Sequence, residues 1–484
     1  MRKHCVVLAA VLVFPQALVA QTKLSAAVEA FVRVEAPVIV LEHVRVIDGT
    51  GAAPAEDQTV VIEGGRIRAL GASAGTPVPE GAKVLDLTGY TVIPGLVGMH
   101  DHMFYPAPAA IGSQGFPAVY TELAYSAPRL YLAAGVTSLR TTGAIEPYTD
   151  LAVKKLIDGG RAPGPKIHVT GPYLEGPGAY TPNMHELDGP DDARRTVDYW
   201  AAEGATSFKA YMHITRAELA AAVEAAHRHG LKITGHLCSI GFREAAALGI
   251  DDLEHGLLVD TEFVPGKVPD VCPPGPEAAQ TLAALDVEGA PVQETIRDLV
   301  ARHVAVTSTL PVFETFVGLR PPLDDRVLEA LAPEARTSYL ATRARRSGNE
   351  KASALAALEL KKEMQFEHDF AQAGGLLLAG EDPTGYGGVL AGFGDQREVE
   401  LLVEAGFTPL EAIHIATANG AAFLGELDRL GTLAPGKSAD LAVIHGNPAR
   451  DIADIEKVEI VFKDGVGYDA AKLIDSVRGQ VGLR

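Results

Sequence analysis

The nine residues PGLVGMHDH, Pro94 to His102, combine a Pro-Gly start, an apolar run and two histidines. Side chains two positions apart on an extended strand point to the same side, so His100 and His102 can reach one ion. Four more polar residues end apolar runs later in the chain: Lys209 in TSFKAY, His236 in LKITGH, His255 in DDLEH and Asp382 in LLLAGED. Nitrogen and oxygen ligands at successive strand ends are what a hydrolytic metal site needs.

The middle of the chain alternates short apolar runs with segments of helical periodicity. We interpret as strands the run before His100 and the runs 136–142, 166–170, 206–211, 231–236, 250–255, 305–309 and 375–380. This alternation favours a parallel sheet, and eight strands with eight helices predict a (β/α)8 TIM barrel. Catalytic groups of such barrels lie at the C-terminal ends of the strands, where all six polar residues are found.

Both ends of the chain have a different, β-rich pattern. TVVIEGGRIRALG, residues 59–71, predicts a hairpin with Gly64 and Gly65 at the turn. The segments GTLAPGKSADLAVIHGNP and VEIVFKDGVGYD continue this pattern near the C-terminus. We therefore predict an α/β chain with a barrel domain at 94–429. A small β-sandwich domain would be formed by both termini, 37–93 plus 430–484.

Residues 1–20 have the pattern of a secretory signal peptide. A basic start at Arg2 and Lys3 precedes an apolar stretch and the small residues of ALVA. The apolar stretch is too short to span a membrane. The sequence thus predicts a secreted or periplasmic protein with no membrane span after signal removal, and it leaves the cleavage position open.

The net charge and the number of cysteines limit the kinds of partner and bond that the sequence allows. The 484 residues carry a formal net charge of −20, which argues against nucleic acid, because phosphate binding needs clustered lysine and arginine. Only Cys238 and Cys272 would remain after signal removal. They could form one bridge in an oxidising compartment, or Cys238 could be a small apolar filler. The oligomeric state stays open, with a homo-oligomer as one candidate.

Taken together, these motifs resemble the amidohydrolase superfamily, in the branch of imidazolonepropionase-related and prolidase-like enzymes. The resemblance covers nearly the whole chain, because GTLAPGKSAD at 431–440 resembles the family's return to the β-sandwich. It implies a site with two zinc ions. His100, His102 and Asp382 would bind the more buried ion, His236 and His255 the second, and carboxylated Lys209 would bridge them.

The resemblance also implies a mechanism. Hydroxide held between the ions would attack a carbonyl carbon, and Asp382 would be the catalytic group that takes its proton and passes it to the leaving amine. The alternative is a one-ion site with Lys209 paired to a carboxylate, and manganese, iron or cobalt could replace zinc. Gly98 departs from the family, because many members have aspartate two residues before the first histidine. We expect Asp101 and Glu254 to make structural hydrogen bonds.

The resemblance implies a small-molecule substrate with an amide bond, such as a dipeptide or an N-acyl amino acid. The alternative is a lactone, an ester or a cyclic amide, which the same site could attack. Arg140 is the only arginine in its run and could hold a substrate carboxylate, or it could form a salt bridge under the barrel rim. The candidates for substrate binding are Tyr105, Arg140, Tyr180, Tyr211 and His213.

Overall fold

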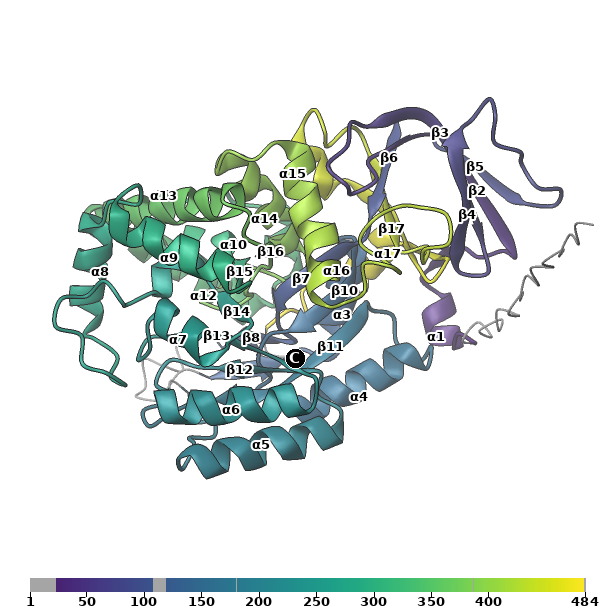
Figure 1. Ribbon diagram of the computed structural model, residues 1–484. Helices are drawn as coiled ribbons and strands as arrows, with labels where there is room; N and C mark the ends of the chain where they lie inside the picture. The colour runs from purple at the N-terminus through teal and green to yellow at the C-terminus, as the bar shows by residue number, and fades with distance from the viewer. Residues whose placement is uncertain (1–22, 108–118, 180, 386, 483–484) are drawn as a thin grey trace, which may run out of the picture.

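The computed structural model describes residues 23–107, 119–179, 181–385 and 387–482 (Figure 1). The predicted signal peptide at 1–20 and the candidate Tyr180 lie outside the described residues. None of the helices in the described ranges combines the length and the apolarity that crossing a membrane requires.

A barrel of eight parallel strands occupies the middle of the chain. In order around the sheet these strands are β7 (Leu96–Asp101), β10 (Val136–Thr141), β11 (Lys166–Leu174), β12 (Ser207–Ala210), β13 (Lys232–Gly235), β14 (Asp252–Glu254), β15 (Ala305–Ser308) and β16 (Leu377–Ala379). Each of the eight predicted runs overlaps one of them, and β16 returns to lie against β7. The TIM-barrel prediction is confirmed, and the C-terminal strand ends meet at one face.

Helices surround this barrel (Figure 1). They are α3 (Ser126–Ala133), α4 (Pro147–Asp158), α5 (Pro190–Glu203), α6 (Arg216–Arg228), α7 (Phe242–Leu248), α8 (Gly275–Ala284), α9 (Ala290–Ala301), α10 (Leu310–Glu314), α11 (Asp325–Ala330), α12 (Pro333–Ser347), α13 (Glu350–Gln372), α14 (Phe393–Glu404), α15 (Pro409–His414) and α16 (Gly420–Phe423). Local sequence sets their ends: Thr215 and Glu218 form a capping box that starts α6, and Gly204 ends α5 in the left-handed conformation.

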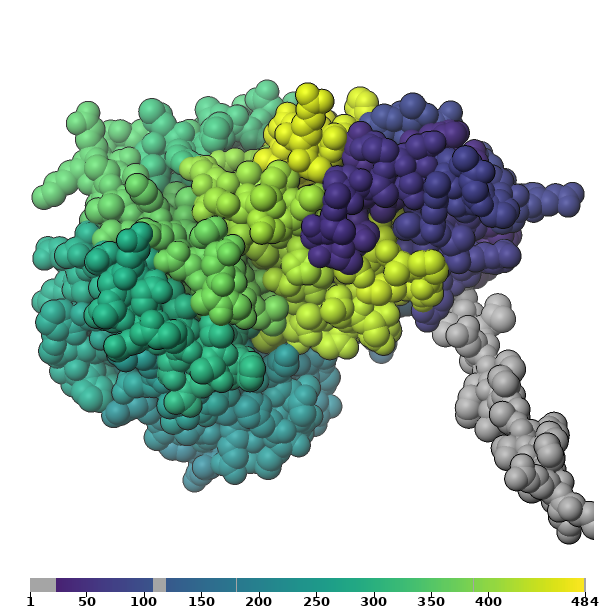
Figure 2. Space-filling model, turned by 45° about the horizontal axis from the view of Figure 1, so that its top comes forward, coloured from purple at the N-terminus to yellow at the C-terminus, as the bar shows by residue number. Residues whose placement is uncertain are grey.

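Strands from both ends of the chain form a second sheet, of nine strands. They are β1 (Val32–Val34), β2 (Val38–Val46), β3 (Ala55–Glu63), β4 (Arg66–Ala72), β5 (Lys83–Asp86), β6 (Tyr90–Pro94), β17 (Leu441–His445), β18 (Val458–Lys463) and β19 (Val466–Asp469). β6 pairs antiparallel with β17, so the purple and yellow ends of the chain lie side by side (Figure 2). Ile39, Val92 and Phe462 share one buried cluster, so the two halves of this sheet pack together.

Three details refine the prediction for the terminal segments. The hairpin of β3 and β4 turns at Gly64 and Gly65, both with positive φ, as predicted. The sheet already includes β1, so it starts before residue 37, with the short helices α1 (Ala26–Glu29) and α17 (Ala470–Asp475) beside it. Lys166 at the start of β11 pairs with Asp440 and Asp464, and these ion pairs tie the barrel to the terminal sheet.

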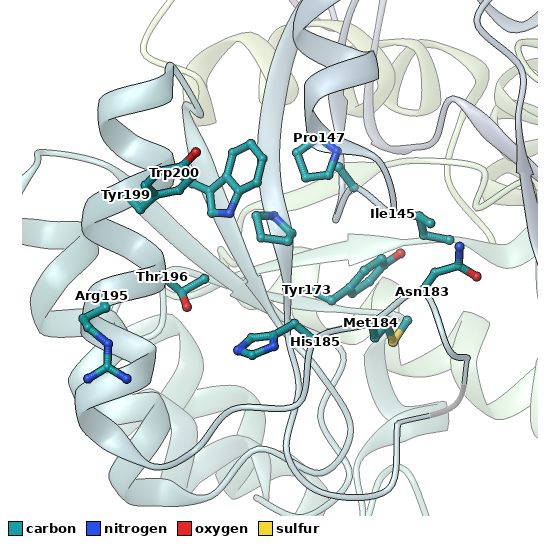
Figure 3. Close-up of a pocket in the computed structure, with 12 residues that line it drawn as sticks. Ile145, Pro147, Tyr173, Asn183, Met184, His185, Arg195, Thr196, Tyr199 and Trp200 are labelled. Carbon is teal, nitrogen blue, oxygen red and sulfur yellow. The ribbon is translucent and has the colours of Figure 1, made fainter.

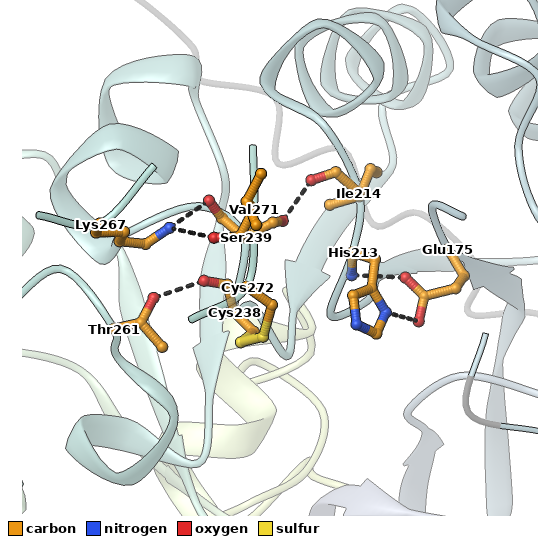
Figure 4. Close-up of a disulfide and its surroundings, with 9 residues drawn as sticks. All are labelled: Glu175, His213, Ile214, Cys238, Ser239, Thr261, Lys267, Val271 and Cys272. Atoms are coloured by element: carbon orange, nitrogen blue, oxygen red, sulfur yellow. Dashed lines mark hydrogen bonds and ion pairs between the residues drawn. A yellow bond between two sulfur atoms is a disulfide. The ribbon is translucent and has the colours of Figure 1, made fainter. Parts of the chain in front are cut away.

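A disulfide joins Cys238 to Cys272, with their Cα atoms 5.0 Å apart (Figure 4). Cys238 lies two residues after His236, so the bond ties the loop after β13 to a later loop. The same loops are joined by Thr261 Oγ1, which donates to the carbonyl of Cys238, and by Lys267 Nζ, which donates to that of Ser239. The reading of Cys238 as an apolar filler is therefore wrong, because its sulfur is bonded.

Reduction of this disulfide is expected to lower the free energy of unfolding by about 3 kcal/mol, because the bond closes a loop between residues 34 apart. Urea unfolding with and without reductant measures the difference. The double variant Cys238→Ser/Cys272→Ser should match the reduced protein and should not respond to reductant. A wild type whose midpoint is the same under both conditions would show that the bond does not stabilise the fold.

Candidate active site

The six residues singled out in the sequence lie at or just beyond the C-terminal ends of five barrel strands. His100 lies in β7 and His102 follows it, and Lys209 lies in β12. His236 directly follows β13, His255 directly follows β14, and Asp382 comes shortly after β16. Five of the six are at least nine-tenths buried, and His236 is half-buried.

The barrel brings these side chains into one cluster. The rings of His100 and His255 have centroids 4.5 Å apart, and those of His236 and His255 are 4.4 Å apart. Lys209 Nζ is 3.1 Å from His100 Nε2, and Asp382 Oδ1 is 3.4 Å from His102 Nε2. Residues up to 282 positions apart in the chain therefore meet at one point, as a shared site requires.

The donor atoms in this cluster fit a divalent metal ion. His100, His102 and Asp382 each offer one ligand atom, and these atoms lie within 4.8 Å of one another. His255 Nε2 is buried without a hydrogen-bond partner among the described residues, while its Nδ1 lies 2.7 Å from Thr309 Oγ1. A buried nitrogen with no donor or acceptor beside it is expensive unless it binds something, and imidazole with carboxylate is an ordinary ligand set for zinc.

Two residues of the cluster have unusual backbone conformations. His255 has φ 68° and Asp382 has φ 50°, both in the left-handed region that favours glycine. Such a conformation costs about 1–3 kcal/mol in a non-glycine residue and collects at functional sites. Here it aims two side chains from the strand ends into the cluster.

A buried charge network lies beneath His100. Glu254 Oε2 is 2.7 Å from His100 Nδ1, and Glu254 Oε1 accepts from Arg140 Nη2 at 2.9 Å. Arg140 also donates to Asp252 at 2.8 Å and to the carbonyl of Met99. Because Glu254 accepts the proton on Nδ1, the Nε2 lone pair of His100 is left facing the cluster.

This network corrects one prediction and confirms another. Arg140 is 1% exposed and holds Asp252 and Glu254, so it lies under the site and does not reach a substrate carboxylate. The structure has instead the salt bridge under the barrel rim, which was the alternative prediction for Arg140. Glu254 makes the expected hydrogen bond, and its partner is a candidate metal ligand.

The electrostatics of the cluster suit acid–base chemistry. Burial lowers the pKa of Lys209 to about 8, so roughly a tenth of this amine is neutral at pH 7. Burial also lowers the pKa of His100 and of His102. Burial opposes ionisation of Asp382, but the neighbouring His100 and His102 outweigh it and hold the pKa of this carboxyl below its usual range.

Comparison with known proteins finds a family match for part of the chain. A sequence model of the amidohydrolase family matches residues 350–467, which include Asp382. A structure from Bifidobacterium longum, assigned as a prolidase, is 26% identical with a TM-score of 0.65, over 91% of this chain and 98% of that one. These matches support assignment of the chain to the amidohydrolase superfamily. Its likeness to the prolidase supports the prolidase-like branch.

Two further structures share the fold of this chain at lower identity. A Xaa-Pro dipeptidase with bound methionine is 20% identical with a TM-score of 0.65, covering 89% of this chain and all 100% of its own. A bottromycin amidohydrolase is 21% identical with a TM-score of 0.69, and 94% of each chain is covered. No curated protein matches the sequence. The family match and the likeness to the prolidase support a hydrolase that acts on carbon–nitrogen bonds.

Aromatic side chains surround the cluster of candidate metal ligands. Phe104 stacks on His102 with centroids 4.3 Å apart, and Tyr211 meets His236 edge-on at 5.0 Å. Tyr173 packs on Tyr211 at 4.8 Å, and Phe313 packs on His255 at 5.6 Å. Tyr173 was missed because β11 extends to Leu174, beyond the predicted run 166–170. Apolar walls of this kind strengthen electrostatic interactions within a site.

The other candidates for substrate binding have varied surroundings. Tyr211 lies in the aromatic wall, whereas His213 is 30% exposed in its side chain, with Nδ1 3.3 Å from Glu175 Oε2. Tyr105 is 3% exposed, and its hydroxyl accepts from the backbone N–H of Gly388 at 3.0 Å. Tyr105 therefore holds the loop after Asp382, and we no longer assign it to a substrate.

Asp101 faces away from the cluster, as expected, and a proton on its carboxyl would give the expected hydrogen bond, to Asp395. Its carboxyl is buried beside those of Glu381 and Asp395, and neither oxygen has a donor among the described residues. Burial and the neighbouring Asp395 raise its pKa well above the usual range, which favours a protonated carboxyl. A Cβ on Gly98 would lie 2.0 Å from Asp101 Oδ2, so glycine at position 98 leaves room for this carboxyl.

Proposed function

We propose that the protein is a metal-dependent amidohydrolase that cleaves the amide bond of a small substrate, such as a dipeptide or an N-acyl amino acid. The observation that carries this proposal is the cluster of four histidines, Lys209 and Asp382, in which His255 Nε2 is buried with no hydrogen-bond partner among the described residues. A divalent ion bound there would lower the pKa of a water molecule and polarise the substrate carbonyl.

The residues of the cluster divide this work. His100, His102 and Asp382 would hold one ion, and His236 and His255 a second. With its pKa held low, Asp382 starts as a carboxylate, accepts the proton of the attacking water and donates it to the leaving nitrogen. The neutral amine of Lys209 would form an N–C bond to carbon dioxide and lose a proton to solvent. The resulting carbamate would supply an anionic ligand for two such ions.

The location of the protein is part of the proposal. Disulfides persist in oxidising compartments, and the Cys238–Cys272 bond fits a secreted or periplasmic protein. The signal-like sequence at 1–20 points the same way. Western blots of periplasmic, culture and cytosolic fractions test it, and a mature protein confined to the cytosol contradicts it.

Release of amine by the mature, zinc-supplied protein tests the reaction itself. The panel consists of dipeptides and N-acyl amino acids, with esters, lactones and cyclic amides of similar size beside them. We expect amine release from at least one linear amide. Turnover confined to esters, lactones or cyclic amides would keep the site and overturn the substrate class.

Metal removal is expected to abolish amine release, because the bound ion would both activate the attacking water and polarise the carbonyl. Dialysis against a chelator followed by readdition of zinc should restore the rate. Metal analysis of the restored protein then counts the ions, with two expected for wild type and one for Lys209→Met. Full activity in metal-free protein would overturn the metal dependence, and equal metal content in both proteins would remove Lys209 as the bridge.

A further inference from the structure

A pocket of about 360 Å³ lies near the C-terminal ends of β10 and β11 (Figure 3). One side of it is formed by α5, from Arg195 to Trp200, and the other by Ile145 and Tyr173. These last two residues come from the loop after β10 and from the end of β11, so the pocket lies at the catalytic end of the barrel. No step of the proposed mechanism uses it.

The pocket and the candidate site share one wall, the ring of Tyr173. This ring has its centroid 6.4 Å from that of His102 and 5.4 Å from Lys209 Nζ. Gly143 makes the arrangement possible, because a Cβ there would lie 2.5 Å from the Tyr173 ring. The carbonyl of Gly143 accepts from His102 Nδ1, and the next residue, Ala144, lines the pocket. A single side chain and one short loop therefore separate the two spaces.

The lining of the pocket suits an aromatic group. Tyr173, Tyr199 and Trp200 offer rings against which another ring can pack. The apolar residues Ile145, Pro147 and Pro172 complete this surface. The exposed edge of the pocket carries the polar side chains of Asn183, His185 and Arg195. The volume is near the lower end for small-molecule sites, about 300–1,000 Å³, so it fits one substituted ring and not a folded partner.

We propose that this pocket binds the aromatic ring of an amide substrate whose scissile bond lies at the candidate metal site. The proposal rests on the proposed function and adds a substrate class to it. The cleaved amide and an aromatic side chain together span about two residue lengths, roughly 7 Å. The ring centroids of His102 and Tyr173 are 6.4 Å apart, so an N-acyl derivative of an aromatic amino acid is long enough to bring its ring to the wall formed by Tyr173. The apolar wall formed by Trp200 then favours phenylalanine over alanine beside the cleaved bond.

Trp200 also supplies the measurement, because it is the only tryptophan in the chain. N-acetylphenylalanine and N-acetylalanine are titrated into the zinc-supplied Asp382→Asn protein, and tryptophan fluorescence is followed. We expect a saturable change with the phenylalanine compound alone. In wild type, kcat/KM for it should exceed that for the alanine compound by roughly tenfold or more.

Two variants on α5 locate the effect. Thr196→Leu adds bulk inside the pocket and should abolish the fluorescence change and bring the kcat/KM ratio close to one. Ala202→Leu, at an exposed position of α5 outside the pocket lining, should keep both. Far-UV circular dichroism checks that both variants fold. A fluorescence change that persists in Thr196→Leu overturns the assignment to this pocket.

The outcomes separate this proposal from the one on which it rests. Amide hydrolysis without a fluorescence change, and without preference for the ring, overturns the pocket and keeps the proposed function. A saturable change specific to the ring, in a protein that hydrolyses no amide, supports the pocket and overturns the proposed function.

Discussion

Asp382→Asn is expected to lower kcat for amine release by roughly 10³-fold while the protein keeps its metal. Asparagine has the size of aspartate and keeps one oxygen as a ligand, but its amide cannot accept the proton of the attacking water. The other oxygen of Asp382 faces His255, with Oδ2 3.9 Å from Nε2, so the carboxylate spans the two halves of the cluster. The measurement is kcat together with metal content on the same sample.

A nearby carboxyl serves as the matched control. Asp395 is also buried, beside Asp101 and Glu381, but it offers no atom to the histidine cluster. Asp395→Asn makes the same chemical change and should leave kcat within a few-fold of wild type. An Asp382→Asn protein that holds full metal and keeps more than a tenth of the wild-type kcat would remove Asp382 from the acid–base role.

The residues that meet at the site could be found in the sequence because barrel geometry makes them meet. Each ends an apolar run, and the parallel strands of a barrel bring all such ends to one face. His236 and Lys209 could be placed in this way without knowing any contact. The apolar runs also predicted the strands, although the run 166–170 ended before β11 does and so missed Tyr173.

Side-chain partners could not be found in this way, because the sequence does not show which distant residues face each other inside the barrel. The carboxylate that Arg140 holds, Asp252, is 112 positions away. Tyr105 bonds the backbone of Gly388, 283 positions away, through a loop with no regular pattern. The sequence also did not show whether Cys238 and Cys272 form a bond, because a loop without regular periodicity brings Cys272 to Cys238. Local periodicity predicts which strand or helix carries a side chain, whereas packing in the fold decides which residues that side chain contacts.

The buried network under the site should carry the largest stability effect. Arg140→Met is expected to lower the free energy of unfolding by about 3–5 kcal/mol, because it leaves Asp252 and Glu254 buried without their cation. Metal affinity should also fall by about 10–100-fold, since Glu254 would no longer be fixed against His100 Nδ1. Urea unfolding and zinc titration measure the two losses separately.

Two further variants test whether the loss of stability comes from the unpaired charges or from the lost volume of the arginine side chain. Arg302→Met removes an exposed pair with Asp298 and should cost less than about 1 kcal/mol. In the double variant Arg140→Met/Glu254→Gln one unpaired carboxylate is gone, so part of the stability should return while zinc affinity stays low. If the double variant is no more stable than Arg140→Met alone, the loss comes from packing around the guanidinium. A zinc affinity that remains at the wild-type value in both variants would show that His100 does not need Glu254 to present its Nε2.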